Sequence, residues 1–542
     1  MGPETNIKSI LALEKQIEEG TGDVIQLRRA RNSLLNISAH VPPEILGHIF
    51  RWNVIREGDF GGLEKGSYNF LLVCHHWFQV ASNTPELWTF WGNTLDQWSR
   101  HYQHFGTAPL DLVLDAPNYP RNTNNALFDN ALRNALQDLA ARDFIRSIHL
   151  RGSNTFLLGS VIFSLILGGE DIRCSNIESL IVQSTELYIS DFLARYRFPK
   201  LRHFHLSVFI GTLSWDQLKL QAPSLTTLSL EFGVPQSSST MPKLLSILAS
   251  YPDLQHLSLY EAMIPRDVND GSTFRVPLRR LKTLHLVGDF RPVFRLLDRL
   301  EYPDTLDHLD LELLKCAAEE ISEYFVPYLQ DRIRRDGRFR DRLGIHAAST
   351  LGSISFKIDA IDDSAISAVP PGVHGHSFLS FRAMFRDTVP QDTVEKLCVA
   401  LAALAPRENV VCLTWELSIH NMENLVITMP NIEALHLIGP VISDPFLQPD
   451  PSSCTKLLPS LRWLSLVDFT LQNSDDWSPL INYLAHQTSG GKPISLGTYG
   501  EHTPLPPEVA KEIEGVFGAR DILATRIPNG DGTLGIDDIP TE

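Results

Sequence analysis

The sequence predicts an α/β protein in which a small all-helical module near the N-terminus precedes an irregular, arc-shaped repeat solenoid. A six-residue motif recurs along most of the chain at intervals of 24 to 32 residues, which is the mark of a repeat array. Apolar residues near the N-terminus recur at helical spacing instead. We therefore expect a helical lead-in at 1–38, a helical module at 39–105, a solenoid at 106–491 and a C-terminal segment at 492–542 with a disordered acidic tail.

The composition limits the class of protein. A net charge of −17 over 542 residues argues against nonspecific binding to nucleic acid or anionic membranes. The six cysteines form no Cys-x-x-Cys pair and no regular framework, so we expect free thiols in a reducing compartment. The N-terminus lacks a secretory signal, and the longest apolar run, 156–167, is too short to span a membrane and should be a buried helix. We expect a cytoplasmic or nuclear protein with no membrane partner.

The lead-in, 7–35, favours helix, with apolar residues seven apart that suggest a heptad. Gly20 and Gly22 interrupt this pattern, so we expect two short helices that fold against the following module, and a monomer outside any complex. Dimerisation through a coiled coil is the alternative.

The module from Val41 to Trp91 carries two helical patterns. The first helix should begin near Pro43, since proline suits the first helical turn. A second apolar stripe recurs at i, i+3, i+4, i+7, i+8 and i+11, and Asn83 to Pro85 should end that helix. The apolar positions are Ile45, Leu46, Ile49 and Phe50 on the first helix and Phe70, Val73, Cys74, Trp77, Phe78 and Ala81 on the second, followed by Leu87, Trp88, Phe90 and Trp91.

These residues spell Pro-Pro-Glu-Ile-Leu-x-x-Ile-Phe from Pro42, Leu-x-Val-Cys-x-x-Trp from Leu71 and Thr-Pro-x-Leu-Trp from Thr84. The pattern resembles the F-box of the large fungal F-box families, although Val41 replaces the usual leucine and Arg51 to Asn69 form an insertion. The resemblance implies a helical module that docks on a Skp-type adaptor, and through it on a cullin. The implied adaptor contacts, some of which should instead form the module's own core, are Pro42, Pro43, Ile45, Leu46, Ile49, Phe50, Val73, Trp77, Leu87 and Trp88. The alternative is a helical hairpin with an aromatic core and no partner.

The repeated hexad reads apolar-x-x-apolar-x-apolar. It appears as IRSIHL at 145, IESLIV at 177, LRHFHL at 201, LTTLSL at 225, LQHLSL at 254, LKTLHL at 281 and LDHLDL at 306, and returns at 351, 410, 432 and 461. This hexad and period are the leucine-rich repeat signature, in which each unit contributes a short strand to a shared core. The segments MPKLLSILAS and RPVFRLLDRL look like helices between strands. The region 315–410 interrupts the array, and an irregular α/β sandwich is the alternative.

Strand alternation places the third, fifth and seventh positions of each unit on the concave face, where solenoids hold partners. These positions could also simply solvate an exposed sheet. Metal binding by their histidines is not expected, because no carboxylate or cysteine accompanies them at a recognised spacing. The candidate target-binding residues are His203, His205, Thr227, Ser229, Glu231, His256, Ser258, Tyr260, His285, His308, Asp310, His436 and Trp463.

Two further segments are rich in charged residues. The arginine-rich stretch 331–342 reads as a solvated helix end, with an acceptor site for a phosphorylated or acidic segment as the alternative. The sequence NGDGTLGIDD resembles a calcium loop, but Ile527 occupies the position of the first carboxylate, so we expect no calcium.

No catalytic motif stands in a fitting context, so we expect a protein that is not an enzyme and needs no cofactor. The resemblance implies a substrate-recognition subunit of a Skp-cullin-F-box ubiquitin ligase, whose repeat arc binds an unknown protein target. The alternative is a leucine-rich-repeat scaffold protein with no ubiquitin-ligase role.

Overall fold

The computed structural model divides into two units, Met1–Leu254 and Gln255–Glu542, and we describe each by itself. Both are α/β with mostly parallel strands, which confirms the predicted class. The described residues are 3–18, 24–35, 41–57, 63–65, 71, 73–91, 108–115, 144–152, 176–186, 197–210, 215, 220–232, 240–266, 274–340, 342–350, 353–360, 377–386, 389–416, 429–438, 460–467, 495–499 and 522–524.

Unit 1 begins with two helices, α1 (Pro3–Glu18) and α2 (Val24–Leu35), which pack on each other. Arg31 of α2 lies 4.0 Å from Glu14 of α1. The two helices lie on either side of the segment that contains Gly20 and Gly22, so the prediction of two short helices is confirmed.

The next segment contains α3 (Pro43–Val54) and α4 (His75–Ser82), followed by the 3-10 turn η3 (Pro85–Trp88) and β3 (Phe90–Trp91). The predicted start of α3 is confirmed. The prediction that Val73 and Cys74 belong to the second helix is wrong, because Cys74 is extended and caps α4 with its side chain.

The prediction that this module is all-helical is also wrong. Strands β1 (Ile55–Glu57) and β2 (Leu63–Lys65) pair antiparallel inside the insertion. The sequence between them contains three glycines, which favour a tight reversal of the chain.

The sheet of unit 1 is parallel, in the order β3-β4-β5-β6-β7-β8. Each hexad in this unit leads into a strand, as predicted, and helix α9 (Met241–Ala249) follows β8 where a helix between strands was expected. The strands after β3 are β4 (Leu110–Asp115), β5 (Ile145–Gly152), β6 (Ser179–Glu186), β7 (His203–Ile210) and β8 (Thr227–Phe232).

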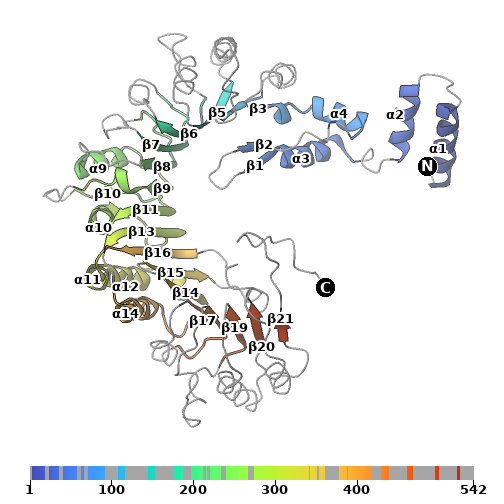
Figure 1. The fold of residues 1–542 in the computed structure, drawn as a ribbon. Helices are drawn as coiled ribbons and strands as arrows, with labels where there is room; N and C mark the ends of the chain where they lie inside the picture. The colour runs from blue at the N-terminus through green and yellow to red at the C-terminus, as the bar shows by residue number, and fades with distance from the viewer. Residues whose placement is uncertain are drawn as a thin grey trace. The chain divides into compact units, whose positions relative to one another are not determined.

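Unit 2 carries the longer sheet, with helices on one side of it (Figure 1). Its strands are β9 (His256–Leu259), β10 (Val276–Pro277), β11 (Thr283–Asp289), β12 (Leu300–Glu301), β13 (His308–Cys316), β14 (Leu343–Thr350), β15 (Ser353–Ala360), β16 (Ser377–Phe385), β17 (Val410–Glu416), β18 (Ala434–Ile438), β19 (Trp463–Val467), β20 (Ser495–Tyr499) and β21 (Ile522–Ala524). Its helical segments are η5 (Glu261–Met263), α10 (Phe290–Arg299), α11 (Ala318–Glu320), the π-helical η6 (Ile321–Phe325), α12 (Val326–Arg335), η7 (Gly337–Arg340) and α14 (Gln391–Ala402).

The main sheet of unit 2 runs in the order β9-β11-β13-β16-β15-β14-β17-β18-β19-β20-β21. All neighbours are parallel except β15, which is antiparallel to both β14 and β16. The hexad at 351 therefore does not form a repeat unit, although it does form a strand. Strands β20 and β21 extend the sheet beyond 492, where we expected the array to end, because backbone pairing does not require the leucine motif.

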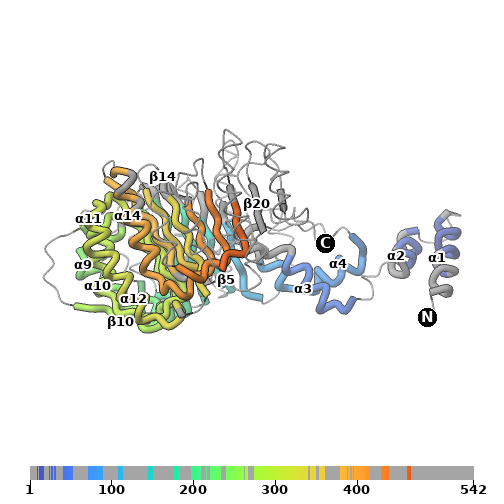
Figure 2. The backbone as a smooth tube through the Cα atoms, turned by 90° about the horizontal axis from the view of Figure 1, so that it is seen from below, coloured from blue at the N-terminus to red at the C-terminus, as the bar shows by residue number. Residues whose placement is uncertain are grey.

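The described helices α10, α11, α12 and α14 lie on one face of the unit 2 sheet (Figure 2). Helix α10 contacts β11 and β13, and α14 contacts β14 and β15. Figure 2 shows α10, α11, α12 and α14 gathered on the same side of these strands. The side chains that face them are buried leucines such as Leu284 and Leu309, and α10 buries Phe290, Val293, Leu296 and Leu297 against them. The opposite face of the sheet carries the polar positions of the repeats.

Several predictions lie outside the described residues. They are the buried helix at 156–167, the calcium-like segment near Ile527 and the acidic C-terminal tail. Among the helices that the structure describes, none has the length and apolar character that crossing a membrane requires.

Tyr251 anchors the end of α9 in unit 1, and we expect it to make this unit sensitive to alkali. Its hydroxyl donates to the Leu220 carbonyl at 3.2 Å, and burial raises the pKa of Tyr251 to about 12. The folded state therefore disfavours the phenolate. Its contribution to stability is complete below pH 10 and is lost between pH 10 and pH 12, by up to about 3 kcal/mol.

Urea unfolding of the full chain at pH 9 and at pH 12 checks this expectation. The Tyr251→Phe variant should lose less stability over that interval than the wild type, and Tyr324→Phe, whose ring is 53% exposed, should behave like the wild type. Equal pH dependence in all three proteins would contradict the assignment.

Candidate functional site

The first candidate site is an apolar surface on α3 and around α4. Leu46 and Phe50 of α3 are buried, and the Phe50 ring lies 5.0 Å from the Trp77 ring. Ile45, Ile49 and Trp52 follow at i, i+4 and i+7, so they share another side of the same helix. We define the docking surface as the exposed side chains of Ile45, Ile49, Trp52, Val73 and Phe78, which are 50%, 51%, 82%, 51% and 46% exposed.

The core beneath this surface is fixed by hydrogen bonds as well as by packing. The Trp88 indole donates to the Ala81 carbonyl at 2.8 Å, and Thr84 donates to the Val80 carbonyl at 2.8 Å. Leu87 is fully buried beside them. The turn after α4 is thereby held against α4 itself, which keeps the docking surface in one shape.

The structure separates the ten predicted adaptor contacts into two groups. The first group is buried in the module's own core, as expected for some of the ten, and consists of Leu46, Phe50, Leu87 and Trp88. Trp77 is half-buried. The residues free to meet a partner are Pro42, Pro43, Ile45, Ile49 and Val73.

Two members of the docking surface were missed or misplaced. Trp52 lies outside the F-box-like motif, but its position seven residues after Ile45 places it on the same side of the helix. Phe78 was assigned to the packed stripe of the second helix, but its side chain is exposed. Ile49 is half-exposed.

The second candidate site is the sheet face opposite the helices, which we call the open face. In unit 1 it carries pairs of polar side chains that bridge neighbouring strands. His203 Nδ1 lies 3.0 Å from Thr227 Oγ1, and Ser207 donates to Glu231 at 2.9 Å. Burial and the nearby Arg202 lower the pKa of His203. His205 lies 3.4 Å from Gln183, and Ser229 is half-buried.

In unit 2 the open face shows the same cross-strand pairing. His256 Nδ1 lies 2.7 Å from Thr283 Oγ1. Ser258 Oγ lies 3.2 Å from His285 Nδ1, and His285 Nε2 lies 3.4 Å from Asp310. The predicted residues His308 and Tyr260 are half-buried on the same face, with the Tyr260 ring edge-on to the His285 ring at 5.2 Å.

The open face does not extend over every strand. In β18 and β19 the equivalent positions His436 and Ser465 are 4% and 0% exposed, so the predicted exposure of His436 is wrong. Trp463 is half-buried. In unit 1, Ser147 and His149 of β5 are likewise buried. Strand alternation decides which side of the sheet a residue faces, but not whether that side is covered.

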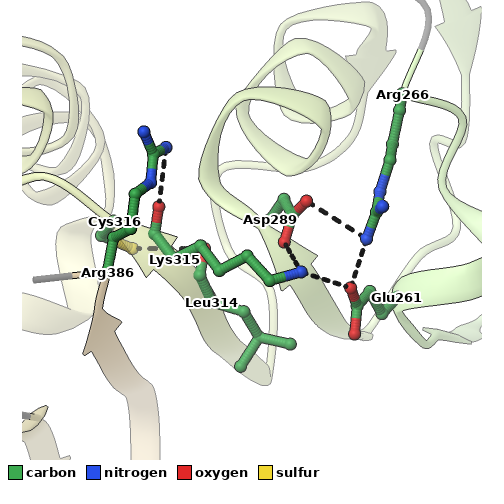
Figure 3. Close-up of polar contacts among 7 residues, drawn as sticks. All are labelled: Glu261, Arg266, Asp289, Leu314, Lys315, Cys316 and Arg386. Atoms are coloured by element: carbon green, nitrogen blue, oxygen red, sulfur yellow. Dashed lines mark hydrogen bonds and ion pairs between the residues drawn. The ribbon is translucent and has the colours of Figure 1, made fainter.

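A group of charged side chains joins the ends of the unit 2 strands that carry the open face (Figure 3). Lys315 Nζ lies 3.2 Å from Glu261 and 3.2 Å from Asp289, and Arg266 pairs with the same two carboxylates. These contacts raise the pKa of Lys315, with the hydrogen bond to Glu261 as the largest cause. Arg386 donates to the Lys315 carbonyl at 3.3 Å. The group holds the ends of β9, β11, β13 and β16 together.

Lys315 has φ of 52°, a left-handed conformation in which a Cβ atom is strained by roughly 1–2 kcal/mol. Lys315→Ala and Lys315→Gly lose the same ion pairs, but only the glycine relieves this strain. We expect Lys315→Gly to be more stable than Lys315→Ala by about 1 kcal/mol in chemical denaturation of the full chain. An alanine variant as stable as the glycine variant would contradict this explanation.

The arginine-rich stretch 331–342 forms internal contacts. Arg332 is buried, donates to the Asp304 carbonyl at 3.1 Å and lies 5.0 Å over the Tyr302 ring. Arg338 pairs with Asp336 at 2.7 Å, and Arg342 pairs with Glu433 at 2.8 Å. These three guanidinium groups pair with groups of the fold itself.

Within the described part of the chain, no group of three or more histidine, cysteine, aspartate or glutamate side chains is arranged to hold a metal ion. Comparisons with models of protein families and with curated proteins found no match to this chain.

Proposed function

We propose that this chain is a non-catalytic substrate-recognition subunit of a Skp-cullin-F-box type ubiquitin ligase. In this proposal the segment 41–91 is an F-box-like module that docks on a Skp-type adaptor, and the strands that follow are an irregular leucine-rich-repeat solenoid that binds the target protein. The single observation that carries the proposal is the docking surface, because α3 has an apolar side exposed to solvent in addition to the side buried in its own core.

An exposed apolar side on a helix is costly to keep unless a partner covers it, and large exposed apolar patches mark interaction sites. The motif from Pro42 to Phe50 supplies the identity of the partner through its resemblance to the F-box. The open face supplies a second, polar surface on different elements, as a molecule that joins two partners requires. The action of such a subunit is proximity, since tethering raises the effective concentration of the target near the ligase.

The proposal implies that the protein works where cullin ligases work, in the cytoplasm or the nucleus, and that it needs no cofactor.

Isothermal titration of the purified full chain with a purified Skp-type adaptor tests the proposal. We expect a complex of one chain with one adaptor and a Kd below about 1 μM, which corresponds to about −8 kcal/mol. Absence of binding at adaptor concentrations of tens of micromolar would overturn the proposal and favour the scaffold protein without a ligase role.

A further inference from the structure

The open face of unit 2 contains one continuous row of side chains whose charges change sign along the row. Strand register makes each member the direct neighbour of the next on six adjacent strands. The row, which we call the cross-strand row, consists of Ser258, His285, Asp310, Ser380, Lys357 and His346.

The cross-strand row is accessible. The side chains of His285 and Asp310 are 30% and 31% exposed, Lys357 is exposed, and Ser258, Ser380 and His346 are half-buried. The row continues in register into Thr414, His436 and Ser465 on β17, β18 and β19, where it is closed, since these are 1%, 4% and 0% exposed. A partner that follows the row can therefore touch only its first six members.

The charges on this row are opposite in sign and separated by a fixed distance. Asp310 on β13 and Lys357 on β15 are two strands apart, which is about 10 Å at the usual spacing of neighbouring strands. Two residues further along β13 and β16, the acidic Glu312 and the basic Arg382 are direct neighbours and lie 3.8 Å apart. The acidic side chains thus lie on β13 and the basic ones on β15 and β16.

We propose that the cross-strand row binds a polypeptide segment of the target that presents a basic and an acidic side chain on one side, about 10 Å apart. This inference rests on the proposed function, because the occupant is taken to be the recruited target. The acidic Asp310 and Glu312 beside the basic Lys357 and Arg382 do not suit nucleic acid or an anionic lipid surface, which carry charge of a single sign. A polypeptide can carry both signs at the required separation.

A polyproline II segment offers this geometry in its simplest form. It has three residues per turn and rises 3.1 Å per residue, so residues i and i+3 lie on one side about 9 Å apart. Short peptides with the core Lys-Pro-Pro-Glu therefore serve as the probe, with Lys-Pro-Pro-Lys and Glu-Pro-Pro-Glu as controls of the same length and conformation.

Fluorescence anisotropy with labelled peptides and the full chain at low ionic strength tests the proposal, because charge pairs at a surface are weakened by salt. We expect the wild type to bind the mixed-charge peptide about fivefold more tightly than either control. The Asp310→Lys variant should prefer the acidic peptide, and Lys357→Glu should prefer the basic one. The double variant, with both changes, should again prefer the mixed-charge peptide, bound in the opposite direction.

A matched control places the charge change on the helix side of the same unit. Lys396→Glu on α14 should keep the wild-type preference. A wild type without preference, or Asp310→Lys and Lys357→Glu variants whose preference does not change, would overturn the inference. Titration of the same variants with the adaptor separates the two proposals, since they should bind the adaptor as the wild type does. A wild type that binds the adaptor but shows no peptide preference refutes this inference and leaves the proposed function standing.

Discussion

The double substitution Ile45→Glu and Ile49→Glu is expected to reduce the affinity for a Skp-type adaptor by about 100-fold or more while leaving the fold intact. Both side chains are half-exposed, so a glutamate at either position remains in water in the free protein. In the complex the same carboxylates would be buried against an apolar surface without a partner, at a cost of several kcal/mol. Titration calorimetry measures the affinity, and thermal unfolding measures the stability.

The control for this variant is Arg51→Glu, which adds negative charge on another side of the same helix. Arg51 is exposed and lies away from the stripe of Ile45, Ile49 and Trp52. It should bind the adaptor within a few-fold of the wild type. Equal losses of adaptor affinity in both variants would show that total charge, and not the docking surface, sets the affinity. If the Ile45→Glu and Ile49→Glu variant bound the adaptor as tightly as the wild type, the docking surface would not be the adaptor site.

The substitution Phe50→Ala is expected to unfold the module that carries the docking surface. The Phe50 side chain is 1% exposed and packs on Trp77, and truncating a buried phenylalanine costs about 3–5 kcal/mol. A loss of this size is a large part of the total stability of a small domain. Adaptor binding should also fall in Phe50→Ala, because the module that carries the docking surface unfolds. In the Ile45→Glu and Ile49→Glu variant the module stays folded and only its surface is changed.

Hydrogen exchange resolves this prediction along the chain. Amides of α3 and α4 should exchange much faster in Phe50→Ala, whereas those of β11 and β13 in unit 2 should be unchanged. Val73→Ala truncates an exposed side chain of the same module and should change stability by less than about 0.5 kcal/mol. Normal protection of α3 in Phe50→Ala would contradict the assignment of this ring to the core.

The sequence alone was sufficient to find the strands that contain the hexads and several of the helices. The hexads at 201 and 281 led into β7 and β11 because an apolar residue at every second position defines a strand with one buried face. The segments MPKLLSILAS and RPVFRLLDRL form most of α9 and α10, because their apolar residues recur at helical spacing. Such local periodicity is set by backbone geometry, which any chain must obey.

Pairing and coverage were decided only by the tertiary structure. The hexad at 351 became the antiparallel strand β15, because β14 ends at Thr350 and β15 begins at Ser353, and strands joined by so short a connection can pair only antiparallel. Phe50 and Ile49 are adjacent in the same motif, yet one is core and the other surface, since Trp77 occupies only one side of α3. His285 and His436 occupy the same position in two repeats, but only His285 remains accessible, because exposure depends on what the rest of the chain places over each strand.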